Sequence, residues 1–421
     1  RLCEANLNTG ATPALHNDRA VISALTARGD SLEHARDYGI TGCVEPGSNG
    51  RFYGASASIL LNLTSVLELT LYNGEHRHTG RGVLISERTG DAGSFTSFDD
   101  FKAAFLRQAS WMIDRAVFLN EALGRTHQEM LPTPILSSLF EGPMEKGKDL
   151  IFGGATLNAS GATIIGFADV VDSLAAIEQV VFVEKALTLP AFLQILDENF
   201  EGHEALLARL RNPARTPKYG NEHPAADRLA RWLAISLDTM FSRKINYRGG
   251  AYRVGYWTMT NHAGFGRLMR ATPNGRRAHE NFTSGLTPVS GVTPSLTKAL
   301  RSIASLPPAL LSNGVAVNLK YTPDPANRQK MLDNFVASVE GYFDPATGGG
   351  TGGMEIQFNV TSRDTFLDAV KNPQAHAELL VRVSGYTAYF KDLNPQMQQE
   401  IIERTEYDLA TGQAVEFTSS K

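Results

Sequence analysis

The stretch Arg382-Val383-Ser384-Gly385-Tyr386-Thr387-Ala388-Tyr389-Phe390 decides how the rest of this chain is interpreted. Its central glycine, Gly385, sits among residues that favour strands, with Leu379-Leu380-Val381 before the stretch and Tyr386 and Phe390 after the glycine. Because glycine weakens a strand, a glycine here usually marks a tight bend or a close approach of the backbone to another group. By itself the stretch is typical of a turn.

A second stretch, Gly42-Cys43-Val44-Glu45-Pro46, combines a cysteine and a glutamate two residues apart. Pro46 and Gly47 close this loop. If the backbone is locally extended, side chains at i and i+2 point the same way. A thiol and a carboxyl would then face one substrate. The alternative is a buried free cysteine beside a surface glutamate.

Together the two stretches resemble two motifs of the glycyl radical enzymes, the family of pyruvate formate-lyase, glycerol dehydratase and choline trimethylamine-lyase. The stretch around Gly385 resembles the loop that bears the radical, and the stretch around Cys43 resembles the catalytic cysteine loop. Their order and separation are those of the family. The resemblance covers nearly the whole chain but only the C-terminal half of the family's longer members. We therefore expect the chain to be the second half of a larger protein.

The resemblance implies an α/β fold, a ten-stranded barrel of two half-barrels with helices outside and both loops inside. This chain would supply the second half-barrel, residues 1–345 with the cysteine loop, and the C-terminal glycyl radical domain, residues 346–421. Half a closed barrel has unpaired edges and an open core. We therefore expect the N-terminal half of the barrel to come from the same gene or from a partner chain, and we expect a homodimer.

Local patterns predict several elements. The apolar run over residues 58–71 has helical length and no breaker, and an amphipathic pattern predicts a helix over residues 98–123. Short strands are expected at residues 248–258, 315–319 and 355–360.

The resemblance also implies a division of roles. Gly385 would store the radical, because a glycine Cα radical is delocalised over two flanking peptide groups and no Cβ blocks close approach. Cys43 would be the thiyl radical that takes hydrogen from the substrate, and Glu45 would be the general base or acid beside it. No bound cofactor is expected. A radical SAM activating enzyme, an iron–sulfur protein, would install the radical by removing the Cα hydrogen of Gly385.

Two departures from the family's patterns bear on the reaction. Dehydratases often carry an aspartate fourteen residues after the cysteine, where it helps to expel the leaving group, and here that position, 43 + 14, is Ala57. Pyruvate formate-lyase-like members carry a Cys-Cys pair, and here Val44 follows Cys43. We therefore expect a lyase that cleaves a C–C or C–S bond in a small anionic substrate. A radical dehydratase or C–N lyase is the alternative.

Two readings without catalysis also remain open. One is a spare-part homologue that supplies only a radical domain, although such a protein needs no cysteine motif. The other is an unrelated binding protein.

An anionic substrate needs a cation or a hydrogen-bond donor in the site, and Arg253 and His76 are the candidates. Trp257, four residues after Arg253, would form a pocket wall. The structural alternatives are a solvent-facing strand residue for Arg253, a solvated loop for His76 and core packing for Trp257. His76 and His78 flank Arg77, but no third ligand has the spacing of a metal motif, so no metal site is expected.

Composition excludes other classes of protein. The 421 residues are 42% hydrophobic and 20% charged, as in ordinary globular proteins. A net charge of −4 indicates no nucleic-acid partner, and no apolar run reaches the roughly 18 residues of a membrane span. Cys3 and Cys43 are the only cysteines, which excludes a disulfide framework and favours a reducing compartment. The alternative to two free thiols is a single Cys3–Cys43 bridge, which would silence the cysteine of the motif. We expect a cytoplasmic protein of anaerobic conditions, including the interior of a bacterial microcompartment.

Overall fold

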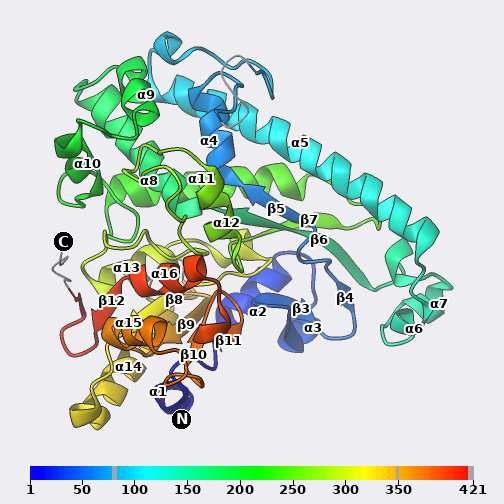
Figure 1. The fold of residues 1–421 in the computed structure, drawn as a ribbon. Coiled ribbons are helices and arrows are strands. Elements are labelled where there is room, and N and C mark those ends of the chain that lie inside the picture. The colour runs from blue at the N-terminus through cyan, green and yellow to red at the C-terminus, as the bar shows by residue number, and fades with distance from the viewer. Residues whose placement is uncertain (78–82, 348–349, 416–421) are drawn as a thin grey trace.

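The computed structural model describes residues 1–77, 83–347 and 350–415. At its centre lie five parallel strands in chain order, the first three paired in one sheet and the last two in a second (Figure 1). They are β5 (Ile59–Asn62), β6 (Leu157–Ile165), β7 (Ala251–Gly255), β8 (Asn318–Tyr321) and β9 (Glu355–Asn359). A single parallel bridge, Tyr256 to Val315, joins the β7 side to the β8 side. Parallel strands with helical crossovers confirm the α/β class.

Shorter strands extend both sides of this arrangement. β4 (Phe52–Tyr53) runs parallel to the start of β6, and β1 (Leu15–His16) runs antiparallel to β9. β12 (Glu406–Asp408) runs parallel to β8, and β13 (Gln413–Ala414) pairs with β12. One sheet thus contains β8, from the first predicted domain, together with β9 and β12, from the second.

Helices connect the parallel strands and cover the outer face of the sheet (Figure 1). They are α4 (Leu63–Leu71) and α5 (Phe98–Met130), then α8 (Phe167–Ile177), α9 (Leu189–Asp197), α10 (Glu204–Arg211) and α11 (Pro224–Ser242), then α12 (Asn261–Leu268), α13 (Leu296–Ala304) and α14 (Arg328–Phe343). On the β7 side, Tyr252 packs on Phe241 of α11 and Tyr256 on Phe167 of α8. Because side chains alternate along a strand, Arg253 therefore points to the opposite, inner face of the sheet.

Residues 58–71 differ from the prediction of one helix. They form β5 and then α4, and the helix begins after Asn62, whose side chain accepts a hydrogen bond from the Thr64 N–H at 3.2 Å. The apolar run carries the same pattern for a buried strand as for a buried helix, so periodicity could not separate them. Asn62, a residue typical of N-caps, is the local signal of the boundary.

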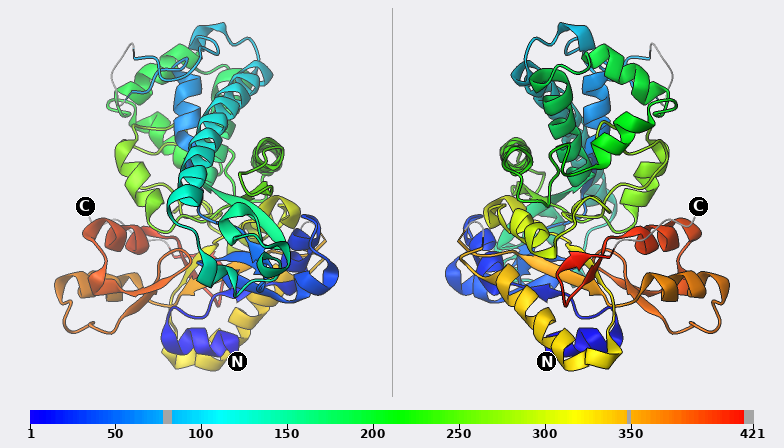
Figure 2. Two further views of the ribbon diagram at one scale, coloured as in Figure 1. Left: turned by 90° about the vertical axis from the view of Figure 1, so that its right-hand side faces the viewer. Right: turned by 90° about the vertical axis from the view of Figure 1, so that its left-hand side faces the viewer.

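The C-terminal elements stand out to one side of the central sheet, in orange and red in Figure 2. They are α15 (Arg363–Lys371), the hairpin of β10 (Leu380–Arg382) and β11 (Thr387–Tyr389), and α16 (Pro395–Glu403). They share a buried apolar cluster that includes Phe366, Val381, Phe390 and Ile401, together with Ala263 of α12. Within the described ranges, none of the helices combines the length and apolarity needed to cross a bilayer.

Candidate active site

Cys43 lies at the tip of a short hairpin. Its strands, β2 (Tyr38–Thr41) and β3 (Glu45–Ser48), pair antiparallel with Thr41 opposite Glu45, which leaves Gly42, Cys43 and Val44 as the tip. Gly42 has a φ of +72°, in the left-handed region that favours glycine. The hairpin therefore fixes the direction in which the thiol and the Glu45 carboxyl are presented.

Gly385 lies at the tip of the β10–β11 hairpin. Arg382 pairs with Thr387 across the two strands, and the Val383 N–H donates to the Tyr386 carbonyl at 2.9 Å. Gly385 itself is buried and has a φ of +93°. An L-residue rarely adopts this conformation, so the tight turn requires glycine at this position.

The two tips meet. A Cβ built on Gly385 would lie 2.2 Å from the Cys43 Cβ and 2.9 Å from its Sγ, far inside van der Waals distance. The hydrogen on Gly385 that takes the place of a side chain therefore points at Cys43. The predicted meeting of the two loops is present in the structure.

The surroundings keep the Cys43 thiol protonated. Burial, and after it the negative charge of Glu45, raises the pKa of the thiol above its ordinary value, and Arg382 opposes this only in part. A cysteine nucleophile needs the opposite, a lowered pKa that yields thiolate. A protonated thiol can instead give up a hydrogen atom. Cys3 and Cys43 are both free thiols, so the alternative bridge is absent.

Glu45 folds back over the tip of its own hairpin. One carboxyl oxygen, Oε2, accepts the N–H groups of Cys43 at 2.7 Å and Val44 at 2.6 Å, and the other, Oε1, accepts the Ser56 hydroxyl at 2.9 Å. Burial raises the pKa of Glu45, and the Val44, Ser56 and Cys43 hydrogen bonds partly offset it. The carboxyl is thus placed beside the thiol with a pKa shifted toward neutrality, as acid–base catalysis requires.

Trp257 forms an apolar wall next to the cysteine. It makes a buried cluster with Val44 and Ala316, against which Cys43 and Met259 pack. Its indole N–H donates to the Asn313 carbonyl at 3.0 Å, which fixes the ring. Trp257 therefore belongs to the surroundings of Cys43, and its cluster also gives it a packing role.

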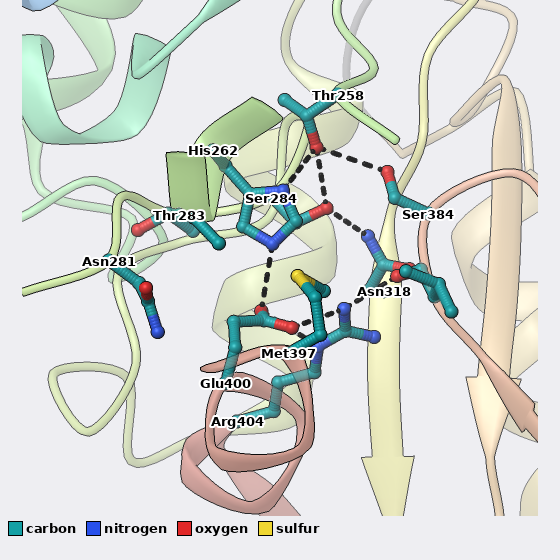
Figure 3. A network of polar contacts seen from close by, with 12 residues as sticks. Thr258, His262, Asn281, Thr283, Ser284, Asn318, Ser384, Met397, Glu400 and Arg404 are labelled. Atoms are coloured by element: carbon teal, nitrogen blue, oxygen red, sulfur yellow. Dashed lines mark hydrogen bonds and ion pairs between the residues drawn. The ribbon is translucent and has the colours of Figure 1, made fainter. Parts of the chain in front are cut away.

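A buried polar network ties the tip of the β10–β11 hairpin to the segment that follows β7, as Figure 3 shows. The Thr258 hydroxyl lies 3.2 Å from the Ser384 hydroxyl, next to Gly385, and 2.9 Å from His262 Nδ1. Ser284 lies 3.0 Å from the same Thr258 oxygen. The residue that precedes Gly385 is thus bound directly to the segment that follows β7.

The same network continues to α16 and returns to the β10–β11 hairpin. His262 Nε2 lies 3.4 Å from Glu400, and Arg404 donates to both Glu400 oxygens, at 3.0 and 2.8 Å. Arg404 also donates to the carbonyls of Arg382 and Val383. Burial alone would raise the pKa of Glu400, but the charges of Arg404 and His262 outweigh it and lower that pKa to about 2.

Arg253 lies on the inner face of the sheet but at a distance from the thiol. It pairs with Asp30 at 3.4 Å and stacks on the Phe52 ring at 4.5 Å. Asp30 also accepts the Ser48 hydroxyl. Ser48 is three residues along β3 from Glu45, about 10 Å at the usual rise. Within the described part of the chain, Arg253 Nη1 has no hydrogen-bond partner.

The structure does not bring His76 to Cys43. His76 follows the C-terminal end of α4 and lies 3.5 Å from Glu68 of that helix, which covers the sheet on its outer side (Figure 1). His78 lies outside the described residues. No group of three or more potential metal-binding side chains occurs in the portion of the chain that the structure describes.

A cavity of about 790 Å³ opens elsewhere, between α16 and the chain segments around Asn274 and Val292. Neither Cys43 nor Gly385 lines it. This cavity is therefore separate from the place where the two hairpin tips meet.

Several residues around the site were missing from the sequence prediction. Ser56 holds the Glu45 carboxyl, and Gln357 accepts the Gly385 N–H at 3.0 Å. Gln357 had a readable signal, because Glu355, Gln357 and Asn359 alternate with apolar residues and so form one polar face of a predicted strand. Ser56 carries no comparable signal.

Two family models match parts of this chain. Residues 1–266 match the family model described as pyruvate formate lyase-like, and residues 282–391 match the glycine radical model. The trans-4-hydroxy-L-proline dehydratase of Clostridioides difficile is 34% identical over 410 residues, 96% of this chain and 50% of the relative. The isethionate sulfite-lyase of Oleidesulfovibrio alaskensis is 32% identical over 405 residues, 94% of this chain and 47% of the relative.

Among solved structures, the glycerol-bound B12-independent glycerol dehydratase from Clostridium butyricum superposes with a TM-score of 0.90 at 33% identity. That match covers 96% of this chain and 50% of the other. The chain thus spans about half the length of the curated relatives it matches. The fold, the two matched models and the meeting of Cys43 with Gly385 lead to one assignment: this chain belongs to the glycyl radical enzyme family.

Proposed function

We propose that the protein is a glycyl radical lyase in which Gly385 stores the radical and Cys43 uses it. In the first step the Cys43 S–H hydrogen atom moves to the Gly385 Cα radical, which leaves a C–H bond on Gly385 and a thiyl radical on Cys43. The thiyl then takes one hydrogen atom from a substrate carbon and returns it after the bond has broken. The observation that carries this proposal is the contact between Gly385 and the Cys43 side chain.

Glu45 is the proposed acid or base. Its position over the Cys43 and Val44 N–H groups, together with a pKa raised by burial, supports a proton transfer to or from the same substrate. Trp257 would wall the substrate space on the Val44 side. The protonated thiol supports transfer of a hydrogen atom in preference to nucleophilic attack.

The proposed substrate is a small molecule with a carboxylate or sulfonate, cleaved at a C–C or C–S bond. Two relatives are named for substrates that carry such a group, trans-4-hydroxy-L-proline and isethionate. Arg253 supports the proposal because its Nη1 has no hydrogen-bond partner among the described residues, although about 10 Å of β3 separates its pairing site from Glu45. His76 lies beside Glu68 of α4, on the outer side of the sheet, and is not part of the proposed substrate site.

A radical dehydratase or C–N lyase is the second candidate. The dehydratases among the relatives and solved structures favour it. Ala57 argues against a mechanism in which a second carboxylate at that position expels the leaving group, and Ala57 is exposed in this chain. A spare-part role is not favoured, because Cys43, Glu45 and Gly385 are assembled as one site.

The partners that the proposal requires are a radical SAM activating enzyme and the rest of the barrel, from the same gene or from a partner chain. We propose an anaerobic cytoplasmic setting, which includes a microcompartment, and a homodimer of the complete protein. The division into a barrel portion, 1–345, and a radical domain, 346–421, is part of the same proposal.

A substrate panel tests the reaction class. The full-length protein, activated anaerobically, would be offered glycerol, propanediol, choline, isethionate, arylacetates and trans-4-hydroxy-L-proline. Turnover of isethionate or an arylacetate supports the proposed C–S or C–C cleavage, turnover of trans-4-hydroxy-L-proline or choline supports the second candidate, and efficient turnover of a neutral diol contradicts the proposal. Arg253→Ala should lower kcat/KM by about 10- to 100-fold, as for a lost charge-assisted pair. Asp30→Asn, which removes the negative charge that pairs with Arg253 but keeps an acceptor oxygen, is the matched control for the ion pair.

A further inference from the structure

Both polar groups of Gly385 are held by hydrogen bonds to two side chains. The Gly385 N–H donates to Gln357 Oε1 at 3.0 Å. The Gly385 carbonyl accepts from Arg382 Nη2 at 3.0 Å, and Arg382 Nε donates to the same Gln357 oxygen. Three hydrogen bonds thus close a ring through Gly385, Gln357 and Arg382.

The orientation of the Gln357 amide follows from its partners. Its oxygen faces two donors, so a flipped amide would place an NH₂ group against two N–H groups. Asn359, two residues further on the same face of β9, fixes the backbone of Arg382. It accepts the Arg382 N–H at 2.8 Å and donates to the Arg382 carbonyl at 2.9 Å. Gln357 and Asn359 are both buried, so water does not compete for the hydrogen bonds of either side chain.

These contacts fall on the two groups over which a glycyl radical spreads. The unpaired electron on the Gly385 Cα is shared with its own nitrogen, which donates electron density, and with its own carbonyl, which withdraws it. An acceptor on the N–H strengthens donation by the nitrogen. A guanidinium on the carbonyl oxygen strengthens withdrawal, and charge-assisted bonds of this kind are the stronger ones. Gln357 and Arg382 therefore act in the same sense.

We propose that Gln357 and Arg382 polarise the Gly385 peptide and so stabilise the radical on Gly385 relative to the thiyl radical on Cys43. They are positioning residues, because they act through the peptide of Gly385 and transfer no atom. In the exchange between the two sites, one hydrogen atom moves from sulfur to carbon or back, and no further reactant is needed. The inference rests on the proposed storage of the radical by Gly385.

The EPR spectrum of the activated full-length protein separates this role from a structural one. The splitting that the remaining Gly385 hydrogen causes reports the spin density on Cα. A residue that merely shapes the loop changes the amount of radical but not this splitting. ¹⁵N-labelled glycine reports the spin density on the nitrogen in the same sample.

Gln357→Leu removes the acceptor, and Arg382→Met removes the cationic donor. In each variant we expect a wider doublet and, without substrate, a decay about tenfold faster, the change that corresponds to about 1.4 kcal/mol. In Gln357→Leu the ¹⁵N coupling should fall as well. Gln357→Glu keeps an acceptor oxygen, so this variant should have the same narrow doublet and slow decay as the unaltered protein.

Asn359→Leu is the matched control, since it removes contacts to the Arg382 backbone but none to Gly385. Its radical yield is free to change, but its splitting should equal that of the unaltered protein. Unchanged splitting and decay in Gln357→Leu and Arg382→Met would overturn the inference. Loss of the radical from Gln357→Leu and Gln357→Glu alike would also overturn it, because the second variant retains the acceptor. A missing doublet in the unaltered protein would instead refute the proposed function.

Discussion

Gly385 points at Cys43: a Cβ built on Gly385 would lie only 2.2 Å from the Cys43 Cβ. They are 342 residues apart in sequence, 385 − 43, and each lies at the tip of its own hairpin. The contact brings a residue suited to storing a radical against a residue suited to using it. Substitutions of the residues around this contact should each change a different measurable property of the protein.

Storage and use of the radical should separate in a Cys43→Ser variant. The O–H bond of serine is too strong for this hydrogen transfer, so turnover should be abolished, while the Gly385 radical should still form. EPR and product assays on the same activated sample check this. Cys3→Ser is the control, since Cys3 packs in the main core and should be dispensable for turnover. Turnover by Cys43→Ser would sink the assignment.

Ser56 should set the pH dependence of Glu45. The Ser56 hydrogen bond lowers the pKa of Glu45 against the larger effect of burial, so Ser56→Ala should raise that pKa further. If Glu45 acts as a base, the acid limb of the kcat profile then moves to higher pH. Glu45→Gln should lower kcat by about 10²- to 10⁴-fold. A Ser56→Ala profile that coincides with that of the unaltered protein would argue against acid–base action by Glu45.

Arg404, between α16 and β12, should contribute more to the stability of the polar network than the other residues in it. Arg404→Met leaves Glu400 buried without its main charge partner, which typically costs about 3–5 kcal/mol. The double variant Arg404→Met with Glu400→Gln should regain part of this loss. Urea denaturation gives the free energies of unfolding. Equal stability of the single variant and the unaltered protein would show that the network contributes nothing to holding the loop.

The network should also weaken in acid. The pKa of Glu400, about 2, lies below its ordinary value in the unfolded chain. Its contribution to stability is therefore fully present above about pH 4.5 and is lost as the pH falls from there toward 2. Glu400→Gln should remove this part of the acid-induced loss of stability.

Glu355 should have the opposite pH dependence: it should lower the free energy of unfolding as the pH rises. It is fully buried, and burial raises its pKa to about 8, against hydrogen bonding from the Val317 N–H and the charge of Arg382. The folded protein then keeps a proton that the unfolded chain has lost. Stability from this group is complete below about pH 4.5 and is gone once the pH passes 8.

Glu355→Gln keeps the side-chain oxygen that accepts the Val317 N–H but cannot ionise. Its advantage in free energy of unfolding should be absent at pH 4, grow up to about pH 8 and then level off. The exposed Glu201→Gln is the matched control. A constant difference between Glu355→Gln and the unaltered protein across this range would contradict the assignment.

The sequence predicted candidate reactive groups but not the residues that surround them. The resemblance around Gly385 and Cys43 depends on short contiguous motifs, and such motifs are readable without a structure. The partners of these residues are scattered: Ser56, Gln357 and Arg404 acquire their roles only when the chain folds. Arg253 shows the opposite case. It is close to Trp257 in sequence, but the structure pairs it with Asp30 and not with the surroundings of Cys43.

The fold was readable where alternation was clear and unreadable where it was not. The strand at Glu355–Asn359 shows its two faces directly in the sequence. Residues 58–71 are apolar throughout, so a strand and a helix joined at Asn62 gave the pattern of one helix. The pairing of β8 with β9 and β12 across the predicted boundary at residue 345 depends on long-range contacts, which no local pattern records.

The most direct test of the central claim is the EPR spectrum of the full-length protein after anaerobic activation by a radical SAM activating enzyme, compared with Gly385→Ala. Alanine at a φ of +93° is strained by about 1–2 kcal/mol, and its Cβ would collide with Cys43. The account predicts a doublet in the unaltered protein, cleavage of its chain at Gly385 on exposure to air, and neither in the variant. A doublet that persists in Gly385→Ala would contradict the storage of the radical at Gly385.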